Sequence, residues 1–181
     1  MDFRQFTPAD FEATLKKWES EAIEHECFPD EVQQKLGPVK ASFTGSLGEV
    51  NTALYYGVFQ PGQTIATALC SLVLSNRGQL GGKWLKMLTL TLSPEVDTLK
   101  MEENFEATAL AVDAYKAAVK GAFAARLEHE ADTLKLYGRS EEQLQFLMVM
   151  LTIINKDPQP ELIAKREGRW LVLRTSTATK E

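Results

Sequence analysis

The spacing of apolar residues near the N-terminus predicts a short strand over residues 3–6 followed by a helix. Thr7 can cap this helix, Pro8 suits its first turn, and Asp10 supports its start. The apolar face of the helix repeats every three to four residues and consists of Phe11, Leu15, Trp18 and Ala22. The chain therefore opens with a strand and an amphipathic helix.

The next stretch is rich in charged residues and contains a proline, which predicts a loop leading into a short helix over about residues 30–36. Gly37 and Pro38 follow, and this pair is expected to end that helix. The pattern over residues 39–49 is ambiguous, although its glycines and a serine suggest a turn before the next strand.

Three strands are predicted in the middle of the chain, over residues 50–59, 64–74 and 84–92. Residues 60–63 read Gln-Pro-Gly-Gln, which predicts a tight turn with proline at its second position and glycine at its third. The run over residues 64–74 is almost continuously apolar, as in a strand buried on both faces. We expect these strands to be antiparallel neighbours.

The C-terminal half predicts a helix over about residues 104–128, a strand over 132–137 and a second helix that Ser140 caps. A closing hairpin is predicted over residues 162–174, with Glu167 and Gly168 forming its turn. The fold class expected from this order is α+β (α/β), with a mixed, mostly antiparallel central sheet of about six to seven strands and helices on both faces.

Composition narrows the function classes. With 181 residues, 44% of them hydrophobic, we expect one domain over residues 1–174 and a polar C-terminal tail over 175–181. A net charge of −5 without clustered cations predicts no nucleic-acid partner. No apolar run approaches the roughly 20 residues that span a bilayer, and the N-terminus lacks a signal-like layout, so we expect no membrane partner and a cytoplasmic location.

Cysteine and histidine are too sparse for a metal site, so no metal is expected. Cys27 and Cys70 match neither a redox pair nor a zinc framework. His25 and His129 stand among glutamates, as histidines at the ends of surface helices do.

The layout resembles the GNAT acetyltransferase superfamily in its order of elements. The segments that carry this resemblance are FRQFTPADFEATL, LTLTLSPEV and LKLYGRSEEQLQFL. The resemblance implies acetyl-CoA or another acyl-CoA as cofactor, and an amine acceptor that is a small molecule or a protein. A homodimer could form through an edge strand. By position, the cofactor's pantetheine arm would lie along Leu90, Thr91 and Leu92.

In the resemblance, the cofactor's pyrophosphate would lie on the loop over residues 93–104, where Lys100 is the sole cation. The superfamily's glycine-containing motif is absent there, and four acidic residues stand in its place. Tyr137 is the candidate acid that protonates the leaving thiolate, and either Glu49 or Glu95 is a candidate base for the acceptor amine.

Two function classes stay open. One is a GNAT-like acyl-CoA-dependent N-acyltransferase with an atypical cofactor loop. The other is a noncatalytic GNAT-fold module that has lost cofactor binding and holds a protein partner.

Overall fold

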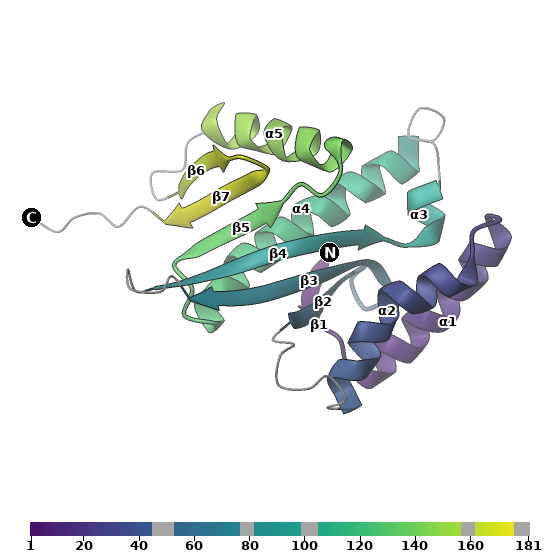
Figure 1. Ribbon diagram of the computed structural model, residues 1–181. Coiled ribbons are helices and arrows are strands. Elements are labelled where there is room, and N and C mark those ends of the chain that lie inside the picture. Colours follow the sequence, from purple (N-terminus) through teal and green to yellow (C-terminus); the bar gives the residue numbers. More distant parts are fainter. Residues whose placement is uncertain (45–52, 77–81, 99–104, 157–161, 176–181) are drawn as a thin grey trace, which may run out of the picture. The chain divides into compact units, whose positions relative to one another are not determined.

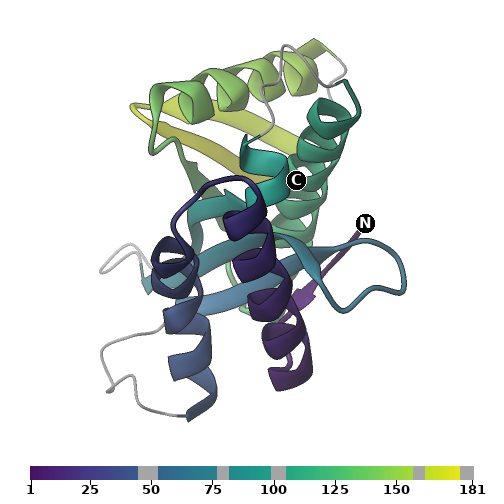
Figure 2. The ribbon, with the colours of Figure 1, turned by 90° about the vertical axis from the view of Figure 1, so that its right-hand side faces the viewer.

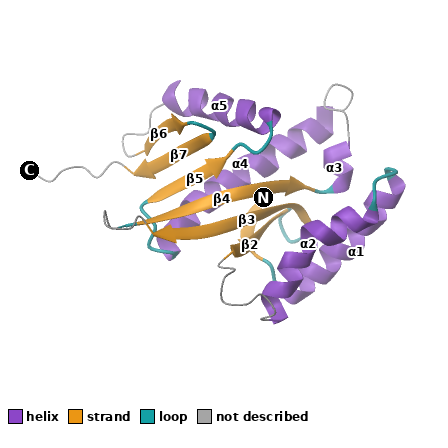
Figure 3. Cartoon of the chain, in the orientation of Figure 1, coloured by secondary structure: helices purple, strands orange, loops and turns teal. Residues whose placement is uncertain are grey.

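A computed structural model of the chain describes residues 1–44, 53–76, 82–98, 105–156 and 162–175 (Figure 1). Figure 3 shows how helices and strands alternate along these residues. The elements in chain order are β1 (Asp2–Gln5), α1 (Pro8–Glu24), α2 (Pro29–Thr44), β2 (Ala53–Phe59), β3 (Ala66–Asn76), β4 (Lys83–Leu92), α3 (Pro94–Thr98), α4 (Phe105–Glu128), β5 (Thr133–Tyr137), α5 (Glu141–Lys156), β6 (Leu162–Glu167) and β7 (Trp170–Thr175).

The strands form a seven-stranded sheet in the order β1-β2-β3-β4-β5-β7-β6. β4 and β5 are parallel, whereas β1–β2, β5–β7 and β6–β7 are antiparallel. The predicted α+β class with a mixed, mostly antiparallel sheet is confirmed. The element order that the GNAT resemblance implied is also present, so the resemblance is confirmed at the level of fold.

The chain divides into two compact units. The first comprises Met1–Ser71 and Leu90–Gly121, and the second comprises Leu72–Thr89 and Ala122–Glu181. β3, β4 and α4 each contribute to both units. The predicted single domain over residues 1–174 stays a prediction, and the tail beyond residue 175 lies outside the described residues.

In the first unit, α1 and α2 lie side by side (Figure 2) and cover one face of the sheet. Trp18 is fully buried there, and its indole Nε1 donates to the carbonyl oxygen of Ala66 at 2.8 Å. Thr14 accepts from the Ala66 amide at 3.0 Å, so two side chains of α1 pair with the start of β3. The core here also takes in residues of α2 and of β2, chiefly Val32, Leu36, Val39 and Phe59.

The predicted start of α1 is confirmed. Thr7 accepts from the Asp10 amide, while the Asp10 carboxylate accepts from the Thr7 amide and hydroxyl, which is a capping box. Arg4 of β1 also pairs with this carboxylate and lies over the Phe59 ring at 3.8 Å. The hydrogen bond from Arg4 lowers the pKa of Asp10 to about 2. The cap thereby joins helix to strand.

α4 packs on the other face of the first unit's sheet through a glycine. A Cβ added at Gly121 would lie 2.2 Å from Cγ of Phe3. Phe3 in turn stacks on Tyr56 with ring centroids 4.8 Å apart. Since only hydrogen occupies that position, α4 approaches β1 closely. Helices therefore cover both faces of the sheet in this unit, as predicted.

The predicted end of the second helix at Gly37 and Pro38 is wrong, because α2 runs from Pro29 to Thr44 with Pro38 inside it. A proline within a helix costs about 3 kcal/mol. Leu36 and Val39 on either side of it are fully buried, and burial of each contributes about 1.5–3 kcal/mol. Burial of the apolar face thus outweighs the local stop signal.

The predicted β2–β3 turn is confirmed. The Gln63 amide donates to the carbonyl oxygen of Gln60 at 3.0 Å, and Gly62 has a φ of 74°, a conformation that glycine adopts without strain. The strands predicted over residues 50–59, 64–74 and 84–92 appear as β2, β3 and β4, with residues 50–52 outside the described part.

In the second unit, β5 pairs with β4 and β7, and α5 contacts β6 and β7. The predicted cap of α5 is confirmed, since Ser140 Oγ accepts from the Gln143 amide at 3.2 Å. The hairpin turn, however, consists of Gly168 and Arg169, one residue later than predicted, because Glu167 is still paired with Trp170 in the sheet. Gly168 has a φ of 62°, which places it at the first central position of the turn.

Candidate functional site

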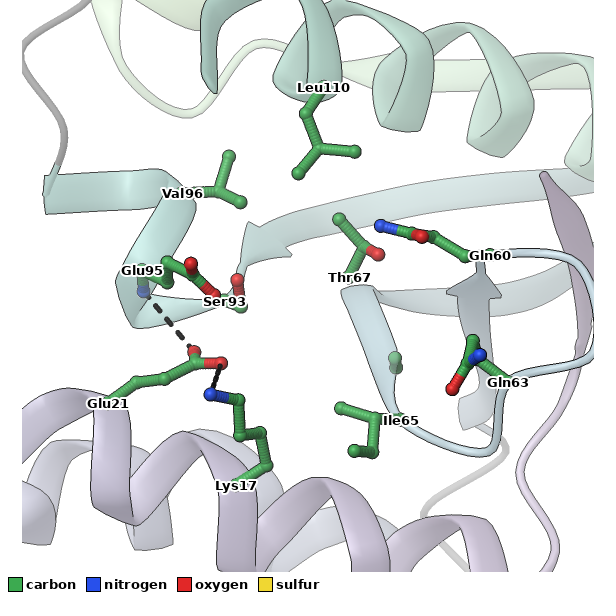
Figure 4. Close-up of a pocket in the computed structure, with 11 residues that line it drawn as sticks. Lys17, Glu21, Gln60, Gln63, Ile65, Thr67, Ser93, Glu95, Val96 and Leu110 are labelled. Atoms are coloured by element: carbon green, nitrogen blue, oxygen red, sulfur yellow. Dashed lines mark hydrogen bonds and ion pairs between the residues drawn. The ribbon is translucent and has the colours of Figure 1, made fainter. Parts of the chain in front are cut away.

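A pocket of about 180 Å³ opens in the first unit between α1, α3 and the β2–β3 turn (Figure 4). Every residue that lines it belongs to this unit. Its polar lining residues are Lys17, Glu21, Gln60, Gln63, Thr67, Ser93 and Glu95. The pocket therefore presents carboxylate, carboxamide, hydroxyl and ammonium groups in a small space.

The fold gathers these residues from elements far apart in sequence. Lys17 and Glu21 are one helical turn apart on α1, which points them at the same space. Ser93 directly follows β4, and its amide donates to the carbonyl oxygen of Thr67 on β3 at 2.9 Å. α3 begins at the next residue and contacts α1. The pocket thus forms where β3 begins and β4 ends, against α1.

Glu21 is the most unusual group in the pocket, because a carboxylate is rarely buried. Only 3% of the residue is exposed. It accepts a hydrogen bond from the Glu95 amide at 3.3 Å, and its Oε1 lies 3.5 Å from Nζ of Lys17. Burial raises the pKa of Glu21, the nearby charge of Glu95 raises it further, and the Glu95 amide and Lys17 partly offset this. A carboxylate in such surroundings is suited to accept a proton.

Glu95, the predicted base, also lines this pocket, and the contact it makes there comes from its backbone. Its side chain is exposed, whereas its backbone amide holds the Glu21 carboxylate. Leu90, Thr91 and Leu92 are the last residues of β4 and lead directly into Ser93. Leu90 and Leu92 are buried and Thr91 is half-buried. Of these predicted residues only Glu95 lines the pocket, and the strand that carries the other three leads into it at Ser93.

Lys100, the other residue predicted to hold the cofactor, and Glu49, the alternative base, lie outside the described residues. Tyr137 belongs to the second unit. It ends β5, is paired with Trp170 of β7 in the sheet, and its ring centroid lies 4.8 Å from that of Trp170. The roles of Tyr137 and Lys100 stay predictions.

The start of the predicted phosphate loop fits a pyrophosphate poorly. The Glu95 amide donates to Glu21, and the amides of Val96 and Asp97 both donate to the carbonyl oxygen of Ser93, at 3.0 and 2.9 Å. The carboxylates of Glu95 and Asp97 are exposed on the same short helix. An anion would find these three amides already bonded and negative charge around them. Residues 99–104, the rest of the loop, lie outside the described part.

β4 extends well beyond its pairing with β5. The register between these parallel strands runs from Trp84 opposite Thr133 to Met87 opposite Leu136. β4 then continues for five residues to Leu92, while β5 ends one residue later at Tyr137. The GNAT resemblance implies that these two strands separate at this point, so that backbone groups of the first strand can pair with the cofactor's pantetheine arm.

Both histidines lie at helix ends, as predicted, and the two cysteines differ in burial. Cys70 is fully buried, and burial raises the pKa of its thiol, so it is not a nucleophile. His25 is the C-cap of α1, and His129 follows the last residue of α4. Within the described residues, no group of three or more His, Cys, Asp or Glu side chains could hold a metal ion. None of the helices described is long and apolar enough to cross a membrane.

Sequence reasoning missed Glu21, although a signal for it exists. Glu21 follows Trp18 by three residues and precedes Ala22, so it lies on the face of α1 that the apolar pattern predicts to be buried. A carboxylate on such a face must find partners or become protonated. Which partners it finds is decided by α3, which no local pattern predicted.

Comparisons with known proteins give structural similarity alone. No family model matches the chain, and no curated protein matches it. Among solved structures, it is similar to a probable acetyltransferase, with 10% identity, 88% of this chain and 89% of that chain covered, and a TM-score of 0.47. It is also similar to AtaTR bound with acetyl-CoA, with 10% identity, 81% and 80% covered and a TM-score of 0.44. The AtaT–AtaR complex bound to DNA matches with 13% identity, 74% and 71% covered and a TM-score of 0.39. Such distant similarity says nothing about activity, which must be argued from the chain's own residues.

Proposed function

We propose that this chain is a GNAT-like N-acyltransferase that uses an acyl-CoA and accepts an amine in the Glu21 pocket. The observation that carries the proposal is a buried carboxylate with a raised pKa, lining a pocket that directly follows the strand predicted to align the cofactor's arm.

In this proposal, Glu21 accepts the proton that the acceptor amine loses as it is acylated. The Glu95 amide keeps the Glu21 carboxylate in position, and the carboxamides of Gln60 and Gln63 can bind polar groups of the acceptor. Tyr137 would donate a proton to the departing sulfur. The acyl-CoA supplies an activated acyl group when bound.

The cofactor would be held by Leu90, Thr91 and Leu92 along its arm, with Lys100 near its phosphates. The bonded amides of Glu95, Val96 and Asp97 do not fit a pyrophosphate.

Calorimetric titration with acetyl-CoA tests the proposal directly, and micromolar binding is expected. Acylation of a panel of primary amines, followed by the release of free thiol, then measures activity. Glu21→Gln should lower kcat/KM by about 10²–10⁴ without weakening acetyl-CoA binding. Glu24→Gln is the matched control, because Glu24 is an exposed carboxylate of the same helix and does not line the pocket.

The pH profile adds a second test of the role of Glu21. Since Glu21 must be ionised to accept a proton, the rate should fall as the pH drops through its raised pKa. Loss of this limb in Glu21→Gln would support the assignment. An unchanged profile would remove Glu21 from the mechanism.

A noncatalytic module that holds a protein partner is the second candidate. The loop chemistry favours it, because three successive amides are bonded internally and two exposed carboxylates repel phosphate. Absence of acetyl-CoA binding at millimolar concentration, with the protein folded, would favour this candidate over the enzyme.

A further inference from the structure

Lys17 places an amine of the chain itself at the mouth of the Glu21 pocket. Its side chain is 45% exposed, so it is open to reagents from solution. Its Nζ nevertheless lies 3.5 Å from Oε1 of Glu21, and Figure 4 shows the two side chains meeting in the pocket. The carboxylate partner of this lysine, unlike the surface carboxylates of ordinary ion pairs, is almost fully buried.

We propose that Lys17 is a self-acylation site, at which the chain transfers an acyl group from a thioester onto its own Nζ. This proposal rests on the proposed function, since it places the acceptor amine in the same pocket. It goes beyond it by naming a modified residue that belongs to the chain.

The chemistry needs only groups that the pocket holds and an acyl thioester from solution. The lone pair of neutral Lys17 Nζ forms a bond to the acyl carbon, and the bond between that carbon and sulfur breaks. Sulfur leaves as a thiolate with the bonding electrons, and the proton lost by nitrogen passes to the Glu21 carboxylate. The product is an amide on Lys17, a protonated Glu21 and a free thiolate, so atoms and charges balance.

Two effects of the carboxylate oppose each other. An adjacent negative charge holds an ammonium in its protonated form and slows acylation, whereas a positioned carboxylate accelerates proton removal. Burial bears on the second effect, because it disfavours the charged form of Glu21 and so makes this carboxylate a stronger proton acceptor. The position of Glu21 as proton acceptor is unaffected, since the Glu95 amide fixes it.

Lys16 is an internal control for this reaction. It precedes Lys17 on α1, is exposed, and does not line the pocket. Cleavage after Glu12 and Glu19 releases one peptide, residues 13–19, that carries both lysines. Fragment-ion mass spectrometry can therefore compare the two sites within one molecule, independent of any catalytic assay.

The experiment exposes the folded chain to the S-acetyl derivative of N-acetylcysteamine, a small thioester without a nucleotide, and in a parallel arm to acetyl-CoA. With the small thioester, we expect Lys17 to be acetylated about tenfold faster than Lys16 or more. The ratio should fall to about one in urea and in Glu21→Gln. A ratio at or below one in the native protein would overturn the proposal.

The urea arm uses the natural sequence, so the proposal stays testable even if Glu21→Gln fails to fold. The acetyl-CoA arm separates the two ideas. Preferential modification of Lys17 by the small thioester, with no acetyl-CoA binding, would support the self-acylation site and reject the acyl-CoA-dependent function. Acetyl-CoA binding and turnover with an unselective Lys17 would do the reverse.

Discussion

Gly121→Ala tests the packing of α4 against β1, on which the first unit depends. An ideal Cβ at this position would lie 2.2 Å from Cγ of Phe3 and 2.4 Å from its Cβ and Cδ1. Carbon atoms in contact are normally about 3.5–4.0 Å apart, so the methyl group is too close by more than an ångström. Phe3 cannot easily move, because its ring stacks on Tyr56 with an interplanar angle of 8°. The residues before and after Phe3 in β1 are also paired with β2.

The expected size follows from two opposing contributions. Replacing glycine by alanine within a helix stabilises it by about 1 kcal/mol. Forcing an extra carbon into a packed contact costs about 1–3 kcal/mol, and a severe overlap falls at the upper end of this range. We therefore expect Gly121→Ala to lower the free energy of unfolding by about 1–2 kcal/mol.

Urea denaturation followed by circular dichroism measures this change. Gly37→Ala is the matched control, since Gly37 also lies inside a helix but an added Cβ would have no atom within 4 Å. It should be neutral or stabilise the protein by at most about 1 kcal/mol, because alanine favours the helix but a Cβ before Pro38 partly opposes it.

A double-mutant cycle assigns the cause. Phe3→Ala removes the ring that the new methyl group meets, so in that background Gly121→Ala should become neutral or stabilising. If Gly121→Ala costs the same with and without the Phe3 ring, or is neutral or stabilising as Gly37→Ala should be, the described contact between α4 and β1 is refuted.

Three further predictions concern charged residues. Asp10→Asn should lower the free energy of unfolding at pH 7 by about 1–2 kcal/mol. The pKa of Asp10 is lowered from 3.8 to about 2, and at about 1.4 kcal/mol per unit this corresponds to about 2.5 kcal/mol. The expected effect is smaller than that figure because Arg4 is partly exposed to solvent. This difference should shrink as the pH falls from 4 towards 2, and urea titrations across that range would reveal a constant difference if the ion pair is unimportant. Glu21→Gln should show the opposite pH dependence of stability. A carboxyl group whose pKa is raised by folding contributes stability below its unfolded-state pKa, and this contribution is lost as the pH rises through the folded-state pKa. The free energy of unfolding of the variant should therefore increase relative to that of the natural protein as the pH rises. Glu26→Gly should raise the melting temperature and increase the free energy of unfolding by up to about 1 kcal/mol, because Glu26 has a φ of 56° that glycine adopts without strain. Glu130 has a φ of 54°, but Glu130→Gly should stabilise the protein less because it also removes the ion pair with Lys83. Equal stabilisation by the two substitutions would contradict this expectation.

The sequence by itself determined the identity and order of most elements, because their signals are local. The cap at Thr7 and the glycine at position 62 of the β2–β3 turn act over only a few residues. The apolar periodicities of α1 and α4 likewise reflect which residues follow one another at helical spacing. The fold class and its resemblance to acetyltransferases could therefore be predicted before any coordinates.

Candidate site residues were predicted only in part. Glu95 was a candidate and lines the pocket, whereas the predicted residues at the end of β4 lead into it without lining it. The prediction concerned the side chain of Glu95, whereas the contact that the structure shows is made by its backbone amide. Such a difference cannot be read from sequence, since every residue carries the same amide and only its surroundings decide whether that amide or the side chain makes the contact.

Tertiary structure alone decided two features. α2 continues through Pro38 because Leu36 and Val39 are buried against other elements, which outweighs a local stop signal. Glu21 has a raised pKa because α1, α3, the start of β3 and the residue that follows β4 enclose it together. Burial depends on atoms distant in sequence, so a pattern of neighbouring residues can say where a side chain points but cannot say what excludes water from it.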